Sequence, residues 1–177
     1  MSTSRRAVAI AALAVIGTAL SACGSDQLFH NSTTAASRGG TQVSTEQVQQ
    51  AVTQIRKAFG TSAAQFDARS AITYLLFADD FQQIAGKVGA AMSVGQARKE
   101  FAQRKVSNPS TAAVDALRSN IALNAIGRSP QGSAEISRIV KAASVKINPR
   151  FGSWDGAKGV VDTTEPWIKA AKKSPAP

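Results

Sequence analysis

Apolar residues recur at intervals of three and four through the middle of the chain, which is the spacing of one face of an α-helix. The first such stripe consists of Val48, Val52, Ile55 and Phe59. Ser44 and Gln47 stand at its start with the spacing of a capping box, in which each side chain binds the other residue's backbone amide. Gly60 follows the stripe and supplies a stop. The pattern predicts an amphipathic helix between these signals.

The same signals predict two more helices. Ser62 and Gln65 have capping-box spacing and precede a long apolar stripe that ends at Gly89. Ser93 and Gln96 repeat the spacing before a shorter stripe. We therefore expect an unbroken second helix and a separate third helix.

Two further helices complete the pattern. A proline suits the first turn of a helix, so a fourth helix is expected from Asn108-Pro109 to Gly127. A fifth is expected from about Ser133 to Ala143, where apolar residues again recur at helical spacing. The five together predict a mostly helical protein.

The period changes after the fifth helix. Val145 and Ile147 alternate with polar residues, as in a half-buried strand, and the proline after Asn148 favours extended backbone there. Thr41–Val43 is a second strand candidate, and a strand needs a partner for its amides and carbonyls. The predicted fold class is therefore mostly α: about five helices, closed by a short two-stranded pairing of the N- and C-terminal segments.

The N-terminal residues have the layout of a secretion signal. Arg5 and Arg6 precede an apolar run over residues 7–20, and small residues follow. A run of 14 residues is shorter than the roughly 20 that a membrane-spanning helix requires. We interpret residues 1–22 as a signal peptide that is removed on export.

The end of this signal resembles the bacterial lipobox. The residues are Leu20, Ser21, Ala22 and Cys23. In a lipobox the cysteine is lipid-modified and becomes the first mature residue. Cys23 is the chain's one cysteine, which otherwise would leave an exported protein with an unpaired thiol. We expect a lipoprotein anchored through Cys23 on the extracytoplasmic face of the cell membrane.

The mature chain divides by composition into three parts. Residues 23–40 are small and polar and end in a glycine pair, which predicts a flexible tether. Residues 41–168 form the expected helical domain, and residues 169–177 form a basic, proline-containing tail. All five predicted helices therefore fall in one domain, residues 41–168.

The chain is basic, with a formal net charge of +10 that falls to +8 without the two signal arginines. Outside the cytoplasm, positive charge suits anionic lipid head groups or envelope polymers, or serves solubility, and we expect no nucleic-acid partner. His30 stands alone without ligands at metal-binding spacing, and Asp79 and Asp80 are adjacent, so they lie on different faces of a helix. We therefore expect no metal, no cofactor and no catalytic residue.

Three segments together resemble the N-terminal domain of SurA-like and PrsA-like extracytoplasmic chaperones. They are TQVSTEQVQQAV, LLFADDFQQIAGKVGAAMSVGQARKEF and VKINPRFGSWD. The last holds the most specific motif, with Asn148, Pro149, Arg150, Phe151, Gly152, Trp154 and Asp155. The resemblance runs from about Thr41 to Asp155 and implies a domain of this kind with these motif residues in a structural role.

The resemblance implies chaperone-like binding of unfolded or partly folded exported proteins. Members of the family often carry a parvulin prolyl-isomerase domain, which needs roughly 90–100 residues. Only 22 residues follow Asp155, and parvulin sites use histidines, so we expect no isomerase activity. The alternative function is an adaptor or scaffold lipoprotein that binds one dedicated partner in the cell envelope.

A chaperone needs apolar surface that clients can reach. The candidate peptide groove consists of Phe77, Phe81, Met92 and Phe101, which cluster around the second predicted helix and the break after it. The apolar stripe there is wider than a single packing face requires, and methionine adapts to varied partners. Packing of the same side chains in the core is the alternative.

Overall fold

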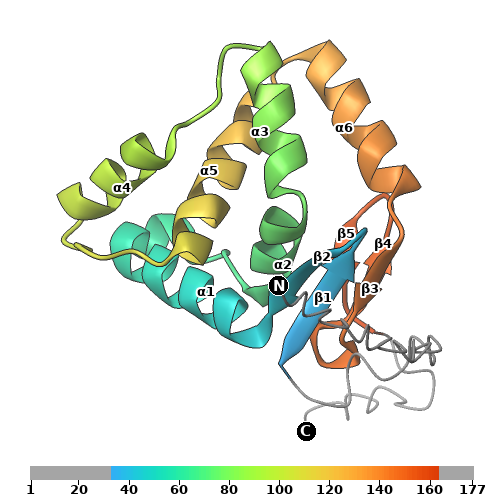
Figure 1. Cartoon of the computed structure of the whole chain (residues 1–177), viewed down its shortest axis with the longest axis horizontal. Helices are drawn as coiled ribbons and strands as arrows, with labels where there is room; N and C mark the ends of the chain where they lie inside the picture. The colour runs from blue at the N-terminus through green and yellow to red at the C-terminus, as the bar shows by residue number, and fades with distance from the viewer. Residues whose placement is uncertain (1–32, 164–177) are drawn as a thin grey trace, which may run out of the picture.

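The protein is described by a computed structural model for residues 33–163 (Figure 1). This part of the chain is mostly α, with six helices and a few short antiparallel strands. The helices are α1 (Thr45–Phe59), α2 (Ala68–Leu76), α3 (Ala78–Lys87), α4 (Val94–Gln103), α5 (Thr111–Ile126) and α6 (Pro130–Ala142). The strands are β1 (Thr34–Arg38), β2 (Thr41–Ser44), β3 (Val145–Ile147), β4 (Ser153–Asp155) and β5 (Gly159–Val161). Within residues 33–163, none of the helices has the length and hydropathy of a membrane span.

Two of the predicted capping boxes are present. At the start of α1, the Ser44 amide donates to Gln47 Oε1 at 2.8 Å and the Gln47 amide donates to Ser44 Oγ at 3.1 Å. Ser93 and Gln96 form the same pair of bonds before α4. Each box satisfies two amides that a helix start otherwise leaves without an acceptor. The predicted α1 is confirmed between Ser44 and Gly60.

The predicted long second helix is wrong in two respects. Residues 60–63 form a short 3-10 helix, η2 (Gly60–Ala63), and Asp67 rather than Ser62 caps the helix that follows. That helix ends at Leu76, and a new one begins after Phe77, whose backbone leaves the helical range. The apolar stripe runs through the break because apolar side chains are buried in α2, at Phe77 itself and in α3.

The last two helices begin at other residues than predicted. Ser110, not Asn108, is the cap of α5, and its Oγ accepts the Ala113 amide at 3.2 Å. Ser129 caps α6, so this helix begins at Pro130, three residues before Ser133. In both helices the first residue is set by a serine side chain that caps the helix. The proline before α5 and the apolar spacing in α6 had predicted other starting residues.

Strand β1 is the centre of a three-stranded sheet, in the order β2-β1-β3 (Figure 1). Ala36 of β1 lies opposite Val43 of β2 and Ile147 of β3, both antiparallel. The predicted strands at Thr41–Val43 and Val145–Ile147 are therefore in one sheet, but they do not pair with each other. The expected tether was also too long, because residues 34–38 belong to this sheet. The expected pairing of an N-terminal with a C-terminal segment of the domain is present, but between β1 and β3.

A second sheet, the β4–β5 hairpin, follows β3. The 3-10 helix η3 (Pro149–Phe151) separates β3 from β4, and Asn148 caps it by accepting the Arg150 amide at 3.2 Å. Asn148 also donates to the Thr34 carbonyl at 3.1 Å, which ties this corner to β1. Gly152 has a φ of 118°, and a Cβ there would lie 2.0 Å from the Val161 carbonyl oxygen. Only glycine fits this corner.

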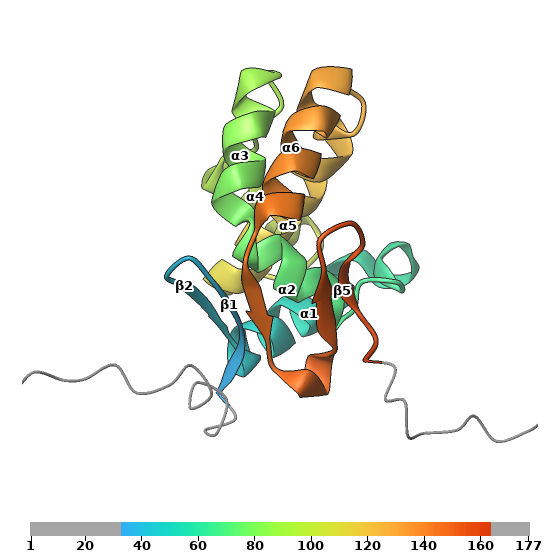
Figure 2. The same ribbon diagram turned by 90° about the vertical axis from the view of Figure 1, so that its right-hand side faces the viewer.

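Helix α5 lies at the centre of the helical part, with α1, α2, α3, α4 and α6 packed on it (Figures 1 and 2). Small residues make up much of its buried surface: Ala112, Ala113, Ala116, Ser119 and Ala122. Small side chains let neighbouring helices approach closely. The buried Ser119 hydroxyl donates to the Tyr74 carbonyl at 2.9 Å, which fixes α2 on α5.

The two parts of the fold meet at Phe77, in the break between α2 and α3. The Phe77 ring is fully buried and stacks on Trp154 of β4, with ring centroids 5.4 Å apart and planes 17° apart. The Arg38 guanidinium of β1 lies 4.1 Å from the centroid of the Phe77 ring. Its Nη1 also binds the Asp80 carboxylate and the Leu76 carbonyl. We call Arg38, Phe77, Asp80 and Trp154 the junction cluster.

We expect Arg38→Ala to lower the free energy of unfolding by about 2 kcal/mol, because it removes a half-buried ion pair, a cation–π contact and a cap of α2 together. Chemical denaturation at constant m-value measures this loss. The control is Arg138→Ala, which changes an exposed residue of α6 and should shift stability by less than about 0.5 kcal/mol. Equal effects of the two substitutions would contradict the role of the junction cluster.

Candidate functional site

The predicted peptide groove is wrong for three of its four residues. Phe77, Phe81 and Phe101 are 0%, 1% and 0% exposed, so they belong to the core. The stripe is wide there because the strands and α5 cover different sides of the same segment. Met92 is half-buried in the connection between α3 and α4, and its carbonyl accepts a hydrogen bond from Arg118. These four residues form no common surface.

Concave surface lies instead along α2. The largest recess, about 590 Å³, is enclosed by α1, η2, α2, α4 and α5. Its apolar wall consists of Ile55, Phe59, Ala63, Phe66, Tyr74, Leu117 and Ile121. Its polar members are Ser62, Gln65, Ser70, Glu100, Arg104 and Asn120. A half-apolar recess of this size, with a few polar groups around it, has the character of a ligand-binding site. We call it the aromatic pocket.

Three aromatic rings with fixed partners give the aromatic pocket its shape. Phe66 packs on Tyr74 with ring centroids 5.8 Å apart. Phe59 meets the buried Phe101 edge to face at 5.9 Å, and the Arg104 guanidinium covers it at 4.3 Å from the ring centroid. Edge-to-face and offset contacts of this kind are favourable and directional. The rings therefore keep their orientation without a ligand.

The hydroxyl of Tyr74 is also held in place. It accepts a hydrogen bond from Asn120 Nδ2 at 3.1 Å, across the interface of α2 and α5. The ring of Tyr74 meets the buried Phe81 edge to face on its other side, at 6.4 Å. Tyr74 thus joins the core to the wall of the aromatic pocket.

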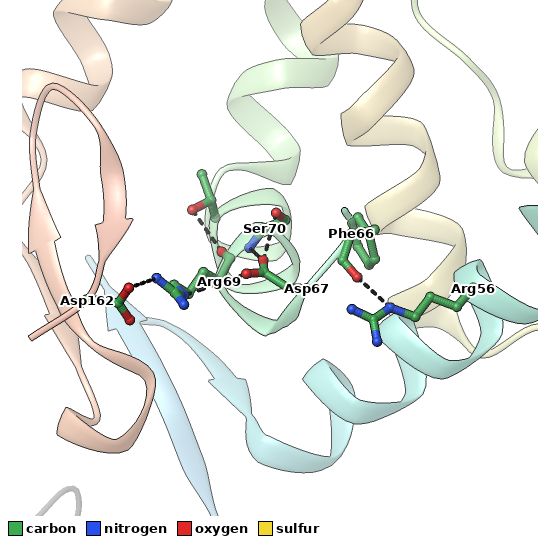
Figure 3. Close-up of polar contacts among 7 residues, drawn as sticks. Arg56, Phe66, Asp67, Arg69, Ser70 and Asp162 are labelled. Atoms are coloured by element: carbon green, nitrogen blue, oxygen red, sulfur yellow. Dashed lines mark hydrogen bonds and ion pairs between the residues drawn. The ribbon is translucent and has the colours of Figure 1, made fainter. Parts of the chain in front are cut away.

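The backbone before α2 positions Phe66. Arg56 of α1 donates from Nε to the Phe66 carbonyl at 2.8 Å (Figure 3). The next residue, Asp67, caps α2 by accepting the Ser70 amide and the Ser70 hydroxyl, both at 2.9 Å (Figure 3). The end of the connection that leads into α2 is thereby fixed, and Phe66 is held in the lining of the pocket.

Two further recesses continue from the aromatic pocket along α2. The middle one, about 290 Å³, shares Ser70 and Tyr74 with the aromatic pocket. It shares Asp67 and Arg69 with an outer recess of about 450 Å³. Because neighbouring recesses share lining residues, they adjoin one another around α2. We call the three together the α2 groove.

An ion pair crosses the outer part of the α2 groove. Arg69 Nη1 lies 2.8 Å from Asp162 Oδ2, and Arg69 Nε lies 3.6 Å from Asp67 Oδ2 (Figure 3). The hydrogen bond and the charge of Asp162 raise the pKa of Arg69 above its ordinary value. Both side chains are well exposed, so the pair adds little stability and a ligand can displace it.

The motif residues divide between the groove and the fold. Pro149, Arg150, Phe151 and Gly152 line the outer recess. Asn148 is buried as the cap of η3, Trp154 belongs to the junction cluster, and Asp155 begins the turn between β4 and β5. The expected structural role fits the last three residues. The motif's contribution to a recess was not predicted.

Sequence reasoning missed the aromatic pocket itself. Phe59 and Phe66 were assigned to the apolar stripes of two helices, whereas a 3-10 helix separates them and turns both toward one recess. The misplaced cap at Ser62 concealed this. The signal that identifies it is Asp67, an equally good cap candidate that starts α2 after Phe66.

Several predicted residues lie outside the described part of the chain. They are Leu20, Ser21, Ala22, Cys23 and His30. Among residues 33–163, no group of three or more histidine, cysteine, aspartate or glutamate side chains is placed to hold a metal ion. Comparison of this protein with family models, curated proteins and solved structures finds no match.

The Asp155 turn gives a test of the local structure beside the groove. The Asp155 carboxylate accepts the amides of Ala157 and Lys158 at 2.7 and 3.0 Å, and these bonds lower the pKa of Asp155 below its ordinary value. Its contribution to stability is therefore present above the unfolded-state pKa, about pH 4, and is lost as the pH falls through the lower folded-state pKa.

We expect Asp155→Asn to reduce the loss of stability between about pH 4 and pH 2, measured as the difference in urea midpoint between variant and parent at each pH. Asp79→Asn is the control, because Asp79 is exposed and caps no turn. An unchanged pH profile in Asp155→Asn would show that the two amide bonds do not form in solution.

Proposed function

We propose that the protein is a lipid-anchored, extracytoplasmic binding protein that holds extended apolar segments of exported, unfolded proteins in the α2 groove. The aromatic pocket carries this proposal, because its partly buried rings Phe59, Phe66 and Tyr74 offer preformed apolar surface at the edge of the core. The role is chaperone-like and non-catalytic. The domain that performs it is proposed to be of the SurA N-terminal kind, with β1 added to its closing strands.

The shape of the groove suits an extended chain. The three recesses adjoin a single helix, α2, whose 9 residues correspond to roughly 13 Å. About four residues of extended polypeptide span this length. One large apolar side chain can enter the aromatic pocket while the neighbouring residues pass the polar middle and outer recesses.

The mixed character of the walls favours weak, exchangeable binding. Ser62, Gln65 and Ser70 supply hydroxyl and amide groups beside the aromatic rings, so a client backbone can keep hydrogen bonds while its side chain is buried. The Arg69–Asp162 pair can open for a client at little cost, since it is exposed. Such a groove binds many sequences and releases them.

The order of elements supports the proposed kinship. A first helix with a capping box, a second capping box at the start of α4 and a closing strand at Val145–Ile147 follow one another as the resemblance implies. The Asn148–Phe151 corner then turns the chain back along the sheet. These elements are general ones, so the support lies in their order.

We expect Phe66→Ser to weaken binding of an unfolded client about tenfold or more, because it removes one aromatic wall of the pocket. The probe is a fluorescently labelled secreted protein, reduced and carboxymethylated so that it stays unfolded, followed by anisotropy. Ser62→Trp should weaken binding as well, since it fills the pocket from an exposed position and removes no core contact.

The matched control is Val94→Ser, which removes an apolar side chain that is 44% exposed on α4. It should leave the affinity unchanged. Equal binding by the parent and both pocket variants would contradict the proposal. Failure to bind any unfolded probe, together with capture of one stoichiometric folded partner by crosslinking, would favour the adaptor function instead.

The anchor is tested separately. Cys23→Ser should abolish incorporation of a labelled fatty acid and move the protein from the membrane fraction to the soluble fraction, because lipid at this residue is the proposed attachment. The control is Ser25→Ala, which leaves the lipobox intact. Unchanged fractionation and no lipid on the parent chain would contradict the anchor without affecting the groove.

A further inference from the structure

A second concave surface lies between α6 and the β4–β5 hairpin. It has a volume of about 230 Å³, and Phe81, Leu123, Ile136 and Val140 form its apolar wall. Figure 2 shows the hairpin turn beside the lower end of α6. The surface adjoins the middle recess of the α2 groove, with which it shares Thr73 and Lys158. We call it the α6 crevice.

Glycines in the hairpin turn bring this wall together. A Cβ on Gly156 would lie 3.4 Å from both Cα and the carbonyl oxygen of Lys141, which is van der Waals contact with the backbone of α6. Gly159 has a φ of 82°, which residues with a side chain rarely adopt. The turn therefore packs directly on the end of α6 and places Lys158 near Lys141, so that both line the crevice.

The charge around the α6 crevice has one sign. Lys141 and Lys158 are the charged residues that line it, and both are exposed. The acidic groups of the same elements are occupied: Asp155 accepts the turn amides, and Glu135 pairs with Lys87 at 2.7 Å. An anion at the mouth thus meets two cations, and no carboxylate is among the residues that line the crevice.

The crevice wall suits an alkyl chain better than a peptide. Apart from the two lysines, its polar side chains are Thr73 and Ser137, and the Thr73 hydroxyl already donates to the Arg69 carbonyl at 3.1 Å. A peptide backbone buried there would leave amides and carbonyls without partners, whereas an alkyl chain has none to satisfy.

We propose that the α6 crevice binds a single acyl chain with an anionic head group, as in a free fatty acid, with the chain against Val140 and Ile136 and the head group at Lys141 and Lys158. This inference goes beyond the proposed polypeptide binding and does not depend on it. It gives a protein of the cell envelope a site for single-chain lipid anions.

The test is a titration of the mature chain, carrying Cys23→Ser, with decanoate, followed by NMR of its methyl groups. The methyl signals of Leu123, Ile136 and Val140 should shift, while those of Ile55 and Ile121 in the aromatic pocket should not. Each methylene removed from the probe should weaken binding by up to about fourfold. Decyl maltoside, with the same chain and an uncharged head, should bind at least tenfold more weakly.

Lys141→Glu should weaken decanoate binding about tenfold or more, because it replaces an attractive charge with a repulsive one. Lys146→Glu makes the same change of charge at an exposed position on β3 and is the matched control. Equal affinities for the two amphiphiles, equal effects of the two substitutions, or shifts confined to Ile55 and Ile121 would each overturn the inference. The last result would leave the α2 groove as the binding site, so the two proposals fail separately.

Discussion

The packing of Arg38 and Trp154 on Phe77 is the contact on which the rest of this structure depends. It joins three elements that are far apart in the sequence: β1, the break between α2 and α3, and β4. Arg38 also binds the carbonyl at the end of α2 and the carboxylate at the start of α3. Where a helix breaks inside the fold, its last carbonyls lose their partners within the helix and need other donors. Arg38 of β1 supplies such a donor to the Leu76 carbonyl, so β1 stabilises this break.

The α2 groove follows from the same arrangement. With its C-terminal end fixed at the junction cluster and its N-terminal end capped by Asp67, α2 has few ways to rotate or shift. Helix α2 packs on the small residues of α5, and the hydrogen bond from Ser119 to the Tyr74 carbonyl fixes the position of α2 along α5. Tyr74, Ser70 and Phe66 then line a recess.

Local signals predicted the parts of the fold that depend on neighbouring residues. The capping boxes at Ser44 and Ser93, the extent of α1 and the strand at Val145–Ile147 are confirmed for that reason. Strand β1 was not predicted, because Thr34-Ala35-Ala36-Ser37 has no alternation and no β-branched or aromatic run. Its two alanines are fully buried, and besides the neighbouring β2 the elements packed on β1 include β3, more than a hundred residues away, and α2, which follows α1. The candidate groove was misplaced for a related reason: periodicity identifies an apolar stripe, but not which elements cover it.

Amide hydrogen exchange of β1 tests the central claim most directly. If β1 is the middle strand that supports the helix break, the amides of Ala36 and Ser37 should exchange about as slowly as those of Ala116 in the centre of α5. Exchange of the β1 amides at the rate of an unstructured peptide, with α5 still protected, would contradict it. The helices would then hold together without the strand, and the position of α2 would need another explanation.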